Sequence, residues 1–349
     1  MKVPTPRKLS SGKWFLTLRL GGESINLSNY DKTALIREAR LIKSEYQAGK
    51  RIPTKKEHEK ITVSDAIDRY IKDKENTLSP STIRGYRAIQ KNRFEKAMRM
   101  TISEAEKANW QKIVDEESKL CAAKYLKNAY AFISSCMLYV ANIRLPNITL
   151  PTPVKNQIPF LQPEEIPKFI AAVKDTNIAV PALLALSSMR ISEISALRWE
   201  DIPPNPDFIK THGAVVRDEN NHWVSKEQQK NLSSSRNVPI LIPELKAAIE
   251  RDRKESGSVI GVKQDTLRLS LHRICKKAGI TDVTVHGLRH SFASLSYHLR
   301  VPEKITMEIG GWKDPATMRN IYTKIANSDI TRYQTQLHEF YKNANKNAN

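Results

Sequence analysis

The alternation of apolar and polar residues near the start of the chain predicts a short sheet followed by one helix. Residues 14–20 alternate, which is typical of a strand, and the glycine pair at 21–22 predicts a hairpin turn into a second strand over 25–27. Asp31 is a suitable cap for the following helix. The predicted buried face of that helix repeats at helical spacing and consists of Leu35, Ala39, Ile42 and Tyr46.

Residues 61–143 have a helical pattern throughout. Ser79 or Ser81 is the predicted cap of one helix, because serine caps the free N–H groups, and Pro80 is expected near its first turn. Ser103 and Glu106 have the spacing of a capping box at the start of another helix. The segment therefore predicts a helical bundle with basic outward faces.

Two polar segments that contain proline, 49–60 and 144–159, are predicted connectors. They divide the chain into three domains of a mainly α fold with small β elements. The domains are a small β-sheet plus helix, a helical bundle, and an α+β domain. Their predicted boundaries are 1–57, 58–150 and 158–341, and residues 342–349 are expected to be a disordered tail.

The charge of the chain points to a polyanionic partner. Lys and Arg number 57 against 37 Asp and Glu, which gives a net charge of +20 and a pI of about 9.8. Such an excess costs self-repulsion, and a pI above ~9 is typical of nucleic-acid binding. An anionic membrane is the alternative, but no dense basic run or amphipathic membrane helix dominates the sequence. We therefore expect a DNA-binding protein with no membrane partner.

The cysteines and apolar runs suggest a cytoplasmic protein. The cysteines, Cys121, Cys136 and Cys275, are far apart and form no metal or disulfide pattern. No apolar run approaches the ~18 residues of a membrane span, and the N-terminus lacks the apolar core of a secretion signal.

Two clusters in the last predicted domain could carry chemistry. Arg190 and Glu193 are expected to be neighbours on one helix, as part of a site or as an exposed ion pair. His286, Arg289 and His290 are expected to share a helix face, where an anion site, a two-histidine metal site and an ordinary surface are the alternatives. The opposite, buried face of that helix is predicted to consist of Leu288, Phe292, Leu295 and Leu299.

Two further segments contain candidate residues. Lys230 precedes a β-like run and is expected on a hairpin, either as a functional cation or as a solvated surface lysine. The glycines at 310–311 interrupt the chain before Trp312, and Asp314 can cap the next helix. Tyr322 lies on that helix, where spacing alone favours a core tyrosine.

Taken together and in order, these segments strongly resemble the tyrosine recombinase (phage integrase) family. They contain an arginine in SSMRISEISALRW, a hairpin lysine, the run HGLRH, a tryptophan after two glycines, and a tyrosine ten residues later. The resemblance covers residues 160–341. The sequence departs from the usual pattern at Met189, Asn231 and Trp312, where leucine, threonine and histidine are more common in the family.

The resemblance implies DNA cleavage and rejoining without a metal, ATP or any other cofactor. Arg190 and Arg289 would bind the oxygens of the reacting phosphate, and Tyr322 would attack it to form a covalent 3′-phosphotyrosine. Lys230 would protonate the departing 5′-oxygen, and His286 would act as a base or proton relay. Trp312 would complete the catalytic set, with its indole N–H donating to a phosphate oxygen. Glu193 would support the site by positioning Arg190 or His286, and His290 would add a hydrogen bond.

The first two predicted domains resemble integrase DNA-binding domains in layout. Residues 1–57 would bind arm-type DNA sites, and residues 58–150 would be a helical core-binding (SAM-like) domain. The implied partners are double-stranded DNA, further copies of the chain in a tetramer, an excisionase and a host DNA-bending protein, in the cytoplasm of a bacterial host and at its nucleoid. The alternative functions are an inactive DNA-binding regulator and a type IB topoisomerase.

Overall fold

The structure is a computed structural model of the whole chain. It describes residues 3–20, 23–47, 60–152, 158–211, 213–226, 235–316 and 327–346. The chain forms two compact units, Met1–Val154 and Lys155–Asn349. Helices predominate in both units and the sheets are small, which confirms the predicted fold class.

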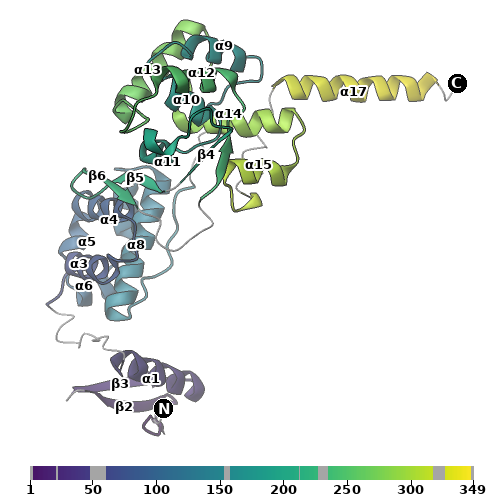
Figure 1. Cartoon of the computed structure of the whole chain (residues 1–349). Coiled ribbons are helices and arrows are strands. Elements are labelled where there is room, and N and C mark those ends of the chain that lie inside the picture. The colour runs from purple at the N-terminus through teal and green to yellow at the C-terminus, as the bar shows by residue number, and fades with distance from the viewer. Residues whose placement is uncertain are drawn as a thin grey trace. The chain divides into compact units, whose positions relative to one another are not determined.

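The first elements form a three-stranded antiparallel sheet with one helix (Figure 1). The strands are β1 (Arg7–Lys8), β2 (Trp14–Leu20) and β3 (Glu23–Asn29), and the helix is α1 (Lys32–Gln47). Leu16 and Leu18 of β2 are buried in one cluster with the predicted helix residues Leu35, Ala39 and Ile42.

The ends of α1 show where the helix prediction was right and where it was not. Asp31 caps the helix as predicted, because its Oδ1 accepts a hydrogen bond from the Thr33 N–H at 2.7 Å. Tyr46 is 42% exposed, so its predicted burial is wrong. Tyr46 lies in the last turn of α1, beyond Ile42, which is the last buried residue of the helix.

A helical bundle over residues 63–141 has its own core (Figure 1). The long helix α8 (Ala123–Ala141) contacts α3, α4 and α7, and it contributes nine buried residues. The other helices are α3 (Val63–Lys74), α4 (Pro80–Asn92), α5 (Glu95–Arg99), α6 (Ile102–Lys107) and α7 (Trp110–Ser118). No helix in the described part of the chain is long and apolar enough to cross a membrane.

The helix caps in the bundle follow the sequence with one correction. Ser79 caps α4 and Pro80 occupies its first position, as predicted. The predicted capping box of Ser103 and Glu106 is wrong, because α6 already begins at residue 102. The capping box is formed earlier in the sequence, by Thr101 and Glu104. The Thr101 backbone is extended, as is typical of a cap residue.

The C-terminal unit is built around α10 (Ala179–Leu186), whose eight residues are all buried. This apolar helix contacts α9 (Ile166–Val173), α11 (Ile191–Ala196), α12 (Pro243–Asp252) and α14 (Val285–His298). The other helical elements are a 3-10 turn (Trp199–Asp201), α13 (Gln264–Ala278), α15 (Glu303–Gly310) and α17 (Asn327–Lys346).

Two small antiparallel pairs of strands complete this unit (Figure 1). β4 (Phe208–Lys210) pairs with β7 (Asn237–Pro239), and β5 (Ala214–Arg217) pairs with β6 (Trp223–Lys226). β5 contacts α11, and β7 contacts α15. One strand of each pair therefore lies against a helix next to the candidate site, β5 against α11 and β7 against α15.

The burial of α14 differs from the predicted stripe. Leu288 is fully buried, but Leu299 is 62% exposed because the helix ends at residue 298. Arg289 and His290, which were expected on the opposite side, are themselves buried. α14 is covered on more than one side, since both α10 and α15 contact it.

At the C-terminus, α17 continues through residues 342–346, which we had assigned to a disordered tail. An existing helix is extended at the cost of one ordered residue per hydrogen bond, and alanine and lysine are good helix formers.

Candidate active site

Arg190 stands at the start of α11 rather than on it, which corrects the sequence-based placement. Its backbone is extended, and it occupies the cap position of a helix in which Glu193 is the third residue. The Glu193 carboxylate therefore reaches back to both parts of Arg190. Oε2 accepts from the Arg190 backbone N–H at 2.9 Å, and Oε1 accepts from Nη1 at 2.7 Å.

The side chains of Arg190 and Glu193 differ in their exposure to solvent. The Arg190 side chain is 43% exposed, whereas that of Glu193 is 8% exposed. Arg190 Nη2 also donates to the Gly311 carbonyl oxygen at 2.9 Å, across 121 residues of sequence. These bonds hold one edge of the guanidinium and leave the group accessible to a ligand.

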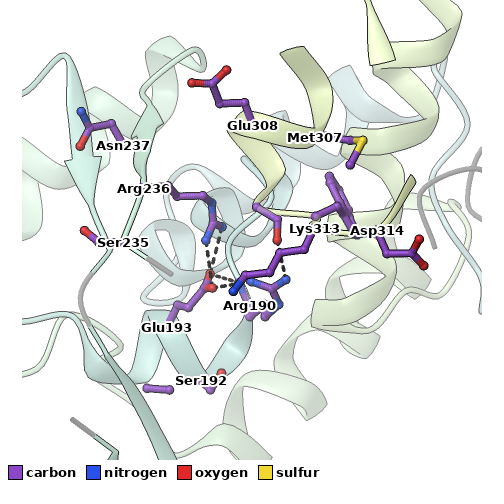
Figure 2. Close-up of a pocket in the computed structure, with 13 residues that line it drawn as sticks. Arg190, Ser192, Glu193, Ser235, Arg236, Asn237, Met307, Glu308, Lys313 and Asp314 are labelled. Atoms are coloured by element: carbon purple, nitrogen blue, oxygen red, sulfur yellow. Dashed lines mark hydrogen bonds and ion pairs between the residues drawn. The ribbon is translucent and has the colours of Figure 1, made fainter. Parts of the chain in front are cut away.

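Arg236 is a site residue that our sequence analysis did not identify. It precedes β7, and Figure 2 shows its guanidinium directed at Glu193 together with that of Arg190. Nη1 and Nη2 donate to the two Glu193 oxygens at 2.9 and 3.0 Å, and Nε donates to the Ile309 carbonyl oxygen at 2.9 Å. In the sequence it is one of many basic residues, because its partners lie 43 and 73 positions away.

Arg289 is the most deeply buried cation of the site, with 2% of its surface exposed. Its Nη1 donates to the Ser188 carbonyl oxygen, and its guanidinium lies 4.1 Å from the centre of the Trp312 ring. Nη2 is buried and has no hydrogen-bond acceptor among the described residues. Burial, together with the charges of Arg190 and Arg236, lowers the pKa of Arg289 to about 9.

Glu193 is the carboxylate that faces these cations. Burial alone raises its pKa, but the hydrogen bonds and charges of Arg236 and Arg190 outweigh that effect and lower the pKa below its usual value. Glu193 is therefore ionised at neutral pH. This one carboxylate therefore lies beside three guanidinium groups.

The two histidines of HGLRH lie on the same side of α14 but differ in burial. His290 is 6% exposed and His286 is exposed, and their rings contact edge to face with centroids 4.6 Å apart. The expected grouping of two imidazoles with Arg289 on one helix is therefore present. No group of three His, Cys, Asp or Glu side chains within the described ranges is arranged to hold a metal ion.

Trp312 is positioned by the end of α15. Gly311 adopts a left-handed conformation, with φ +65°, which ends the helix and lets the Trp312 N–H donate to the Met307 carbonyl at 3.0 Å. The indole is nearly parallel to the Phe292 ring, with centroids 6.4 Å apart. Asp314 caps the segment that follows, as predicted, by accepting from the Ala316 N–H at 3.0 Å.

Arg190, Glu193, Arg236, Trp312 and Asp314 line a cleft of about 820 Å³. Figure 2 shows side chains from α11, the start of β7 and the end of α15 directed toward it, including Lys313 beside Arg190. Its walls therefore come from segments that are distant in sequence. Lys230 and Tyr322 lie outside the described residues. The lining contains both cationic and acidic side chains, and the accessible guanidinium of Arg190 is suited to a phosphate group.

Comparisons with known proteins identify the class. Residues 159–329 match the model of the phage integrase family. Residues 159–329 of the C-terminal unit are therefore a phage integrase family domain, which confirms the resemblance inferred from the sequence for this part of the chain.

Relatives extend this result. The integrase of Salmonella phage P22 is 23% identical over 206 residues, which cover 57% of this chain and 52% of the integrase. A "tyrosine recombinase XerC-like" protein of Caldanaerobacter subterraneus subsp. tengcongensis is 29% identical over 222 residues, covering 54% of this chain and 56% of that protein. The chain thus spans about half the length of these curated relatives.

Solved structures show the same fold. The integrase of transposon Tn1549, in complex with transposon right end DNA, matches 79% of this chain and 99% of its own with a TM-score of 0.57 and 16% identity. The XerH site-specific recombinase bound to a palindromic difH substrate matches 78% of this chain and 95% of its own, with a TM-score of 0.50 and 16% identity.

Proposed function

We propose that this protein is a site-specific tyrosine recombinase that integrates and excises a mobile DNA element. The observation that carries the proposal is the cluster of guanidinium groups around one carboxylate: Arg190 and Arg236 bond Glu193 at the cleft, and Arg289 is buried close enough for their charges to lower its pKa. A phosphodiester under attack gathers negative charge, and preorganised cations that stabilise this charge are usually the largest catalytic contribution. The buried, unsatisfied Nη2 of Arg289 is suited to one of those oxygens.

The proposed reaction is two successive transfers of a phosphoryl group. The Tyr322 phenol oxygen attacks the DNA phosphorus and the bond to the 5′-oxygen breaks, which leaves a 3′-phosphotyrosine. Lys230 supplies the proton to that 5′-oxygen, and His286 moves the phenol proton. A 5′-hydroxyl of another strand then attacks the phosphotyrosine and releases Tyr322. The number of phosphoester bonds is unchanged, so no ATP, metal or cofactor is required.

The supporting residues have separate roles in this proposal. His290 contacts His286 and helps to hold its ring, while Glu193 orients Arg190. Trp312 packs against Arg289 and takes the place of the histidine that is more common in the family. An indole can donate a hydrogen bond to a phosphate oxygen but cannot accept or release a proton at neutral pH. The proton transfers are therefore assigned to the other residues.

Residues 1–57, here called the N-terminal module, are proposed to bind a second, arm-type DNA site. The sheet face opposite α1 carries hydrogen-bonding side chains, among them Thr17, which donates to the Asn26 Oδ1 across the strands at 2.8 Å. Arg19 on the same face is exposed, and Arg7 lies 5.2 Å from the Phe15 ring centre. Cationic and amide side chains are those that contact phosphates and base edges.

The remaining partners complete the proposal. The helical bundle binds core-site DNA with the C-terminal unit, and four protomers assemble on two DNA sites. Ile330 and Leu337 of α17 are exposed and separated by two helical turns, which suits docking on a neighbouring protomer. An excisionase and a host DNA-bending protein set the direction of recombination in the bacterial cytoplasm.

A covalent-trapping experiment tests the proposal. The substrate is labelled duplex DNA from the regions that flank the coding sequence, with a nick that lets a short cleaved fragment diffuse away. We expect the wild-type protein to form a covalent adduct and Tyr322→Phe to bind the DNA without forming one. Tyr333→Phe, in α17, is the matched control and should react like the wild type.

Other outcomes lead to different functions. An adduct with Tyr322→Phe means that another tyrosine is the nucleophile. DNA binding by the wild type without any adduct indicates an inactive regulator. Relaxation of supercoiled plasmids regardless of their sequence indicates a type IB topoisomerase.

A further inference from the structure

Arg236 contacts several parts of the site while remaining almost inaccessible itself. Its side chain is 10% exposed, compared with 43% for that of Arg190. Each of its three guanidinium nitrogens donates to a protein oxygen, two of them to Glu193 and one to the Ile309 carbonyl. A group bonded in this way is better suited to holding neighbours in place than to binding a substrate.

Ser188 connects Arg236 to the second catalytic arginine. It is a buried non-glycine residue in a left-handed backbone conformation, with φ +78°. That conformation turns its carbonyl oxygen toward two guanidinium groups. It accepts from Arg289 Nη1 and, at 3.3 Å, from Arg236 Nη2. The Ser188 hydroxyl donates to the Ile309 carbonyl at 3.3 Å, which is also the acceptor of Arg236 Nε.

The end of α15 is fitted closely around Arg236. A Cβ atom on Gly311 would lie 2.9 Å from the Arg236 Cδ, so the backbone approaches the arginine as nearly as a glycine allows. The Gly311 carbonyl is in turn the acceptor of Arg190 Nη2. Arg236 therefore bonds or touches each protein group that orients the guanidinium groups of Arg190 and Arg289, apart from Trp312.

We propose that Arg236 is a positioning residue that fixes Arg190 through Glu193 and fixes Arg289 through the Ser188 carbonyl. This inference rests on the proposed function, because the positioned groups are those that would bind the reacting phosphate. A buried carboxylate that bonded only Arg190 could draw that cation out of the cleft. The fork of Arg236 shares the Glu193 charge and leaves the outer edge of Arg190 available to DNA.

The test compares Arg236→Lys with the wild type. Lysine keeps the charge beside Glu193 but cannot bridge it to the Ser188 and Ile309 carbonyls. At saturating nicked duplex, we expect the rate of adduct formation to fall by about 10²-fold, since a displacement of ~1 Å can cost that much. The affinity for DNA should stay within about twofold. Arg198→Lys alters an exposed arginine paired with Glu200 and should leave the rate unchanged.

A double-mutant cycle separates positioning from a general structural effect. Each single variant, Arg236→Lys and Arg190→Lys, lowers the cleavage rate by some factor. If Arg236 acts through Arg190, the factor for the double variant should be at least ten times smaller than the product of the two single factors. Losses that simply multiply would overturn the proposal. A fall in DNA affinity that accounts for the whole loss would also overturn it, because Arg236 would then be a DNA contact.

A measurement without DNA keeps this inference separate from the proposed function. The Nε–Hε NMR signals of Arg190 and Arg289, assigned by their loss in lysine variants, should shift or broaden in Arg236→Lys and remain in place in Arg198→Lys. If these signals respond but the wild type never forms an adduct, positioning stands and the recombinase proposal fails. Unchanged signals overturn positioning. If Arg236→Lys does not fold, Arg236→Gln replaces it, since its amide can still donate to Glu193.

Discussion

Replacing Arg289 by methionine should make the free protein more stable while abolishing DNA cleavage. Burial beside Arg190 and Arg236 lowers the pKa of Arg289 to about 9. The fall from 12.5 to about 9 corresponds to an unfavourable contribution of about 5 kcal/mol, at ~1.4 kcal/mol per pKa unit. The hydrogen bond to Ser188 and the contact with Trp312 offset about 2–3 kcal/mol of it. Methionine fills a similar volume and can also pack on the indole.

The net expectation is an increase of about 2–3 kcal/mol in the free energy of unfolding at pH 7, or about 4–12 °C in the melting temperature. Denaturant titration and calorimetry without DNA measure it, and Arg198→Met provides an exposed control. The advantage should shrink above pH 9, because the unfolded wild-type chain then binds the proton more readily than the folded one and wild-type stability rises relative to the variant. A variant that is less stable than wild type by about 1 kcal/mol would refute the reasoning.

The other predictions concern the carboxylate, the N-terminal module, the reaction conditions and a cap. Glu193→Gln should lower the free energy of unfolding by about 3 kcal/mol, since it leaves buried guanidinium groups without their counter-charge. The wild type should lose stability as the pH falls through the depressed pKa of Glu193, and the variant should lose less. Equal acid-unfolding curves for the two proteins would contradict this. Deleting residues 1–57 should spare adduct formation at core sites and abolish arm-site binding in gel-shift assays. Adduct formation should persist in EDTA, and a strict requirement for Mg²⁺ would argue against the proposed chemistry. Thr101→Ala should cost about 1 kcal/mol of stability by removing the α6 capping box, whereas Ser103→Ala should cost less than about half of that.

Local signals in the sequence predicted local structure well. The alternation at 14–20, the cap at Asp31 and the pair Ser79-Pro80 each depend on neighbouring residues, and the structure contains all three features. The prediction of the capping box failed because a long-range contact decides it. Ser103 and Glu106 have the right spacing, but Thr101 and Glu104 have the same spacing, and the choice depends on where the preceding chain is held. The Thr101 backbone pairs with Thr62, across 39 residues.

The composition of the site was predictable only where the family resemblance supplied it. The structure contains the pairs Arg190–Glu193, Arg289–Trp312 and His286–His290, and all of these residues were named through that resemblance. Their geometry did not follow from spacing. Arg190 was expected on a helix, and its cap position is set by the turn at residue 188, whose left-handed conformation is atypical of serine.

Arg236 had no sequence signal because everything it bonds is distant along the chain. Helical or strand periodicity reports which side of an element is buried, and Arg236 lies just before a three-residue strand, too short to show a period. Its importance follows from the Glu193, Ser188 and Ile309 oxygens that surround it, and only the folded structure brings these together.

The left-handed turn at Gly311 has a consequence for the timing of activity. Its carbonyl is an acceptor for Arg190, and the next residue forms the wall behind Arg289, so the cation pair is complete only when the chain has been synthesised past residue 312. A chain still emerging from the ribosome, or one cut before this turn, would retain its basic surfaces and could still associate with the chromosome. Under the proposed function, such a chain could not cleave DNA, because Arg190 and Arg289 would lack their contacts with Gly311 and Trp312. Incomplete chains would therefore not damage the genome that encodes them.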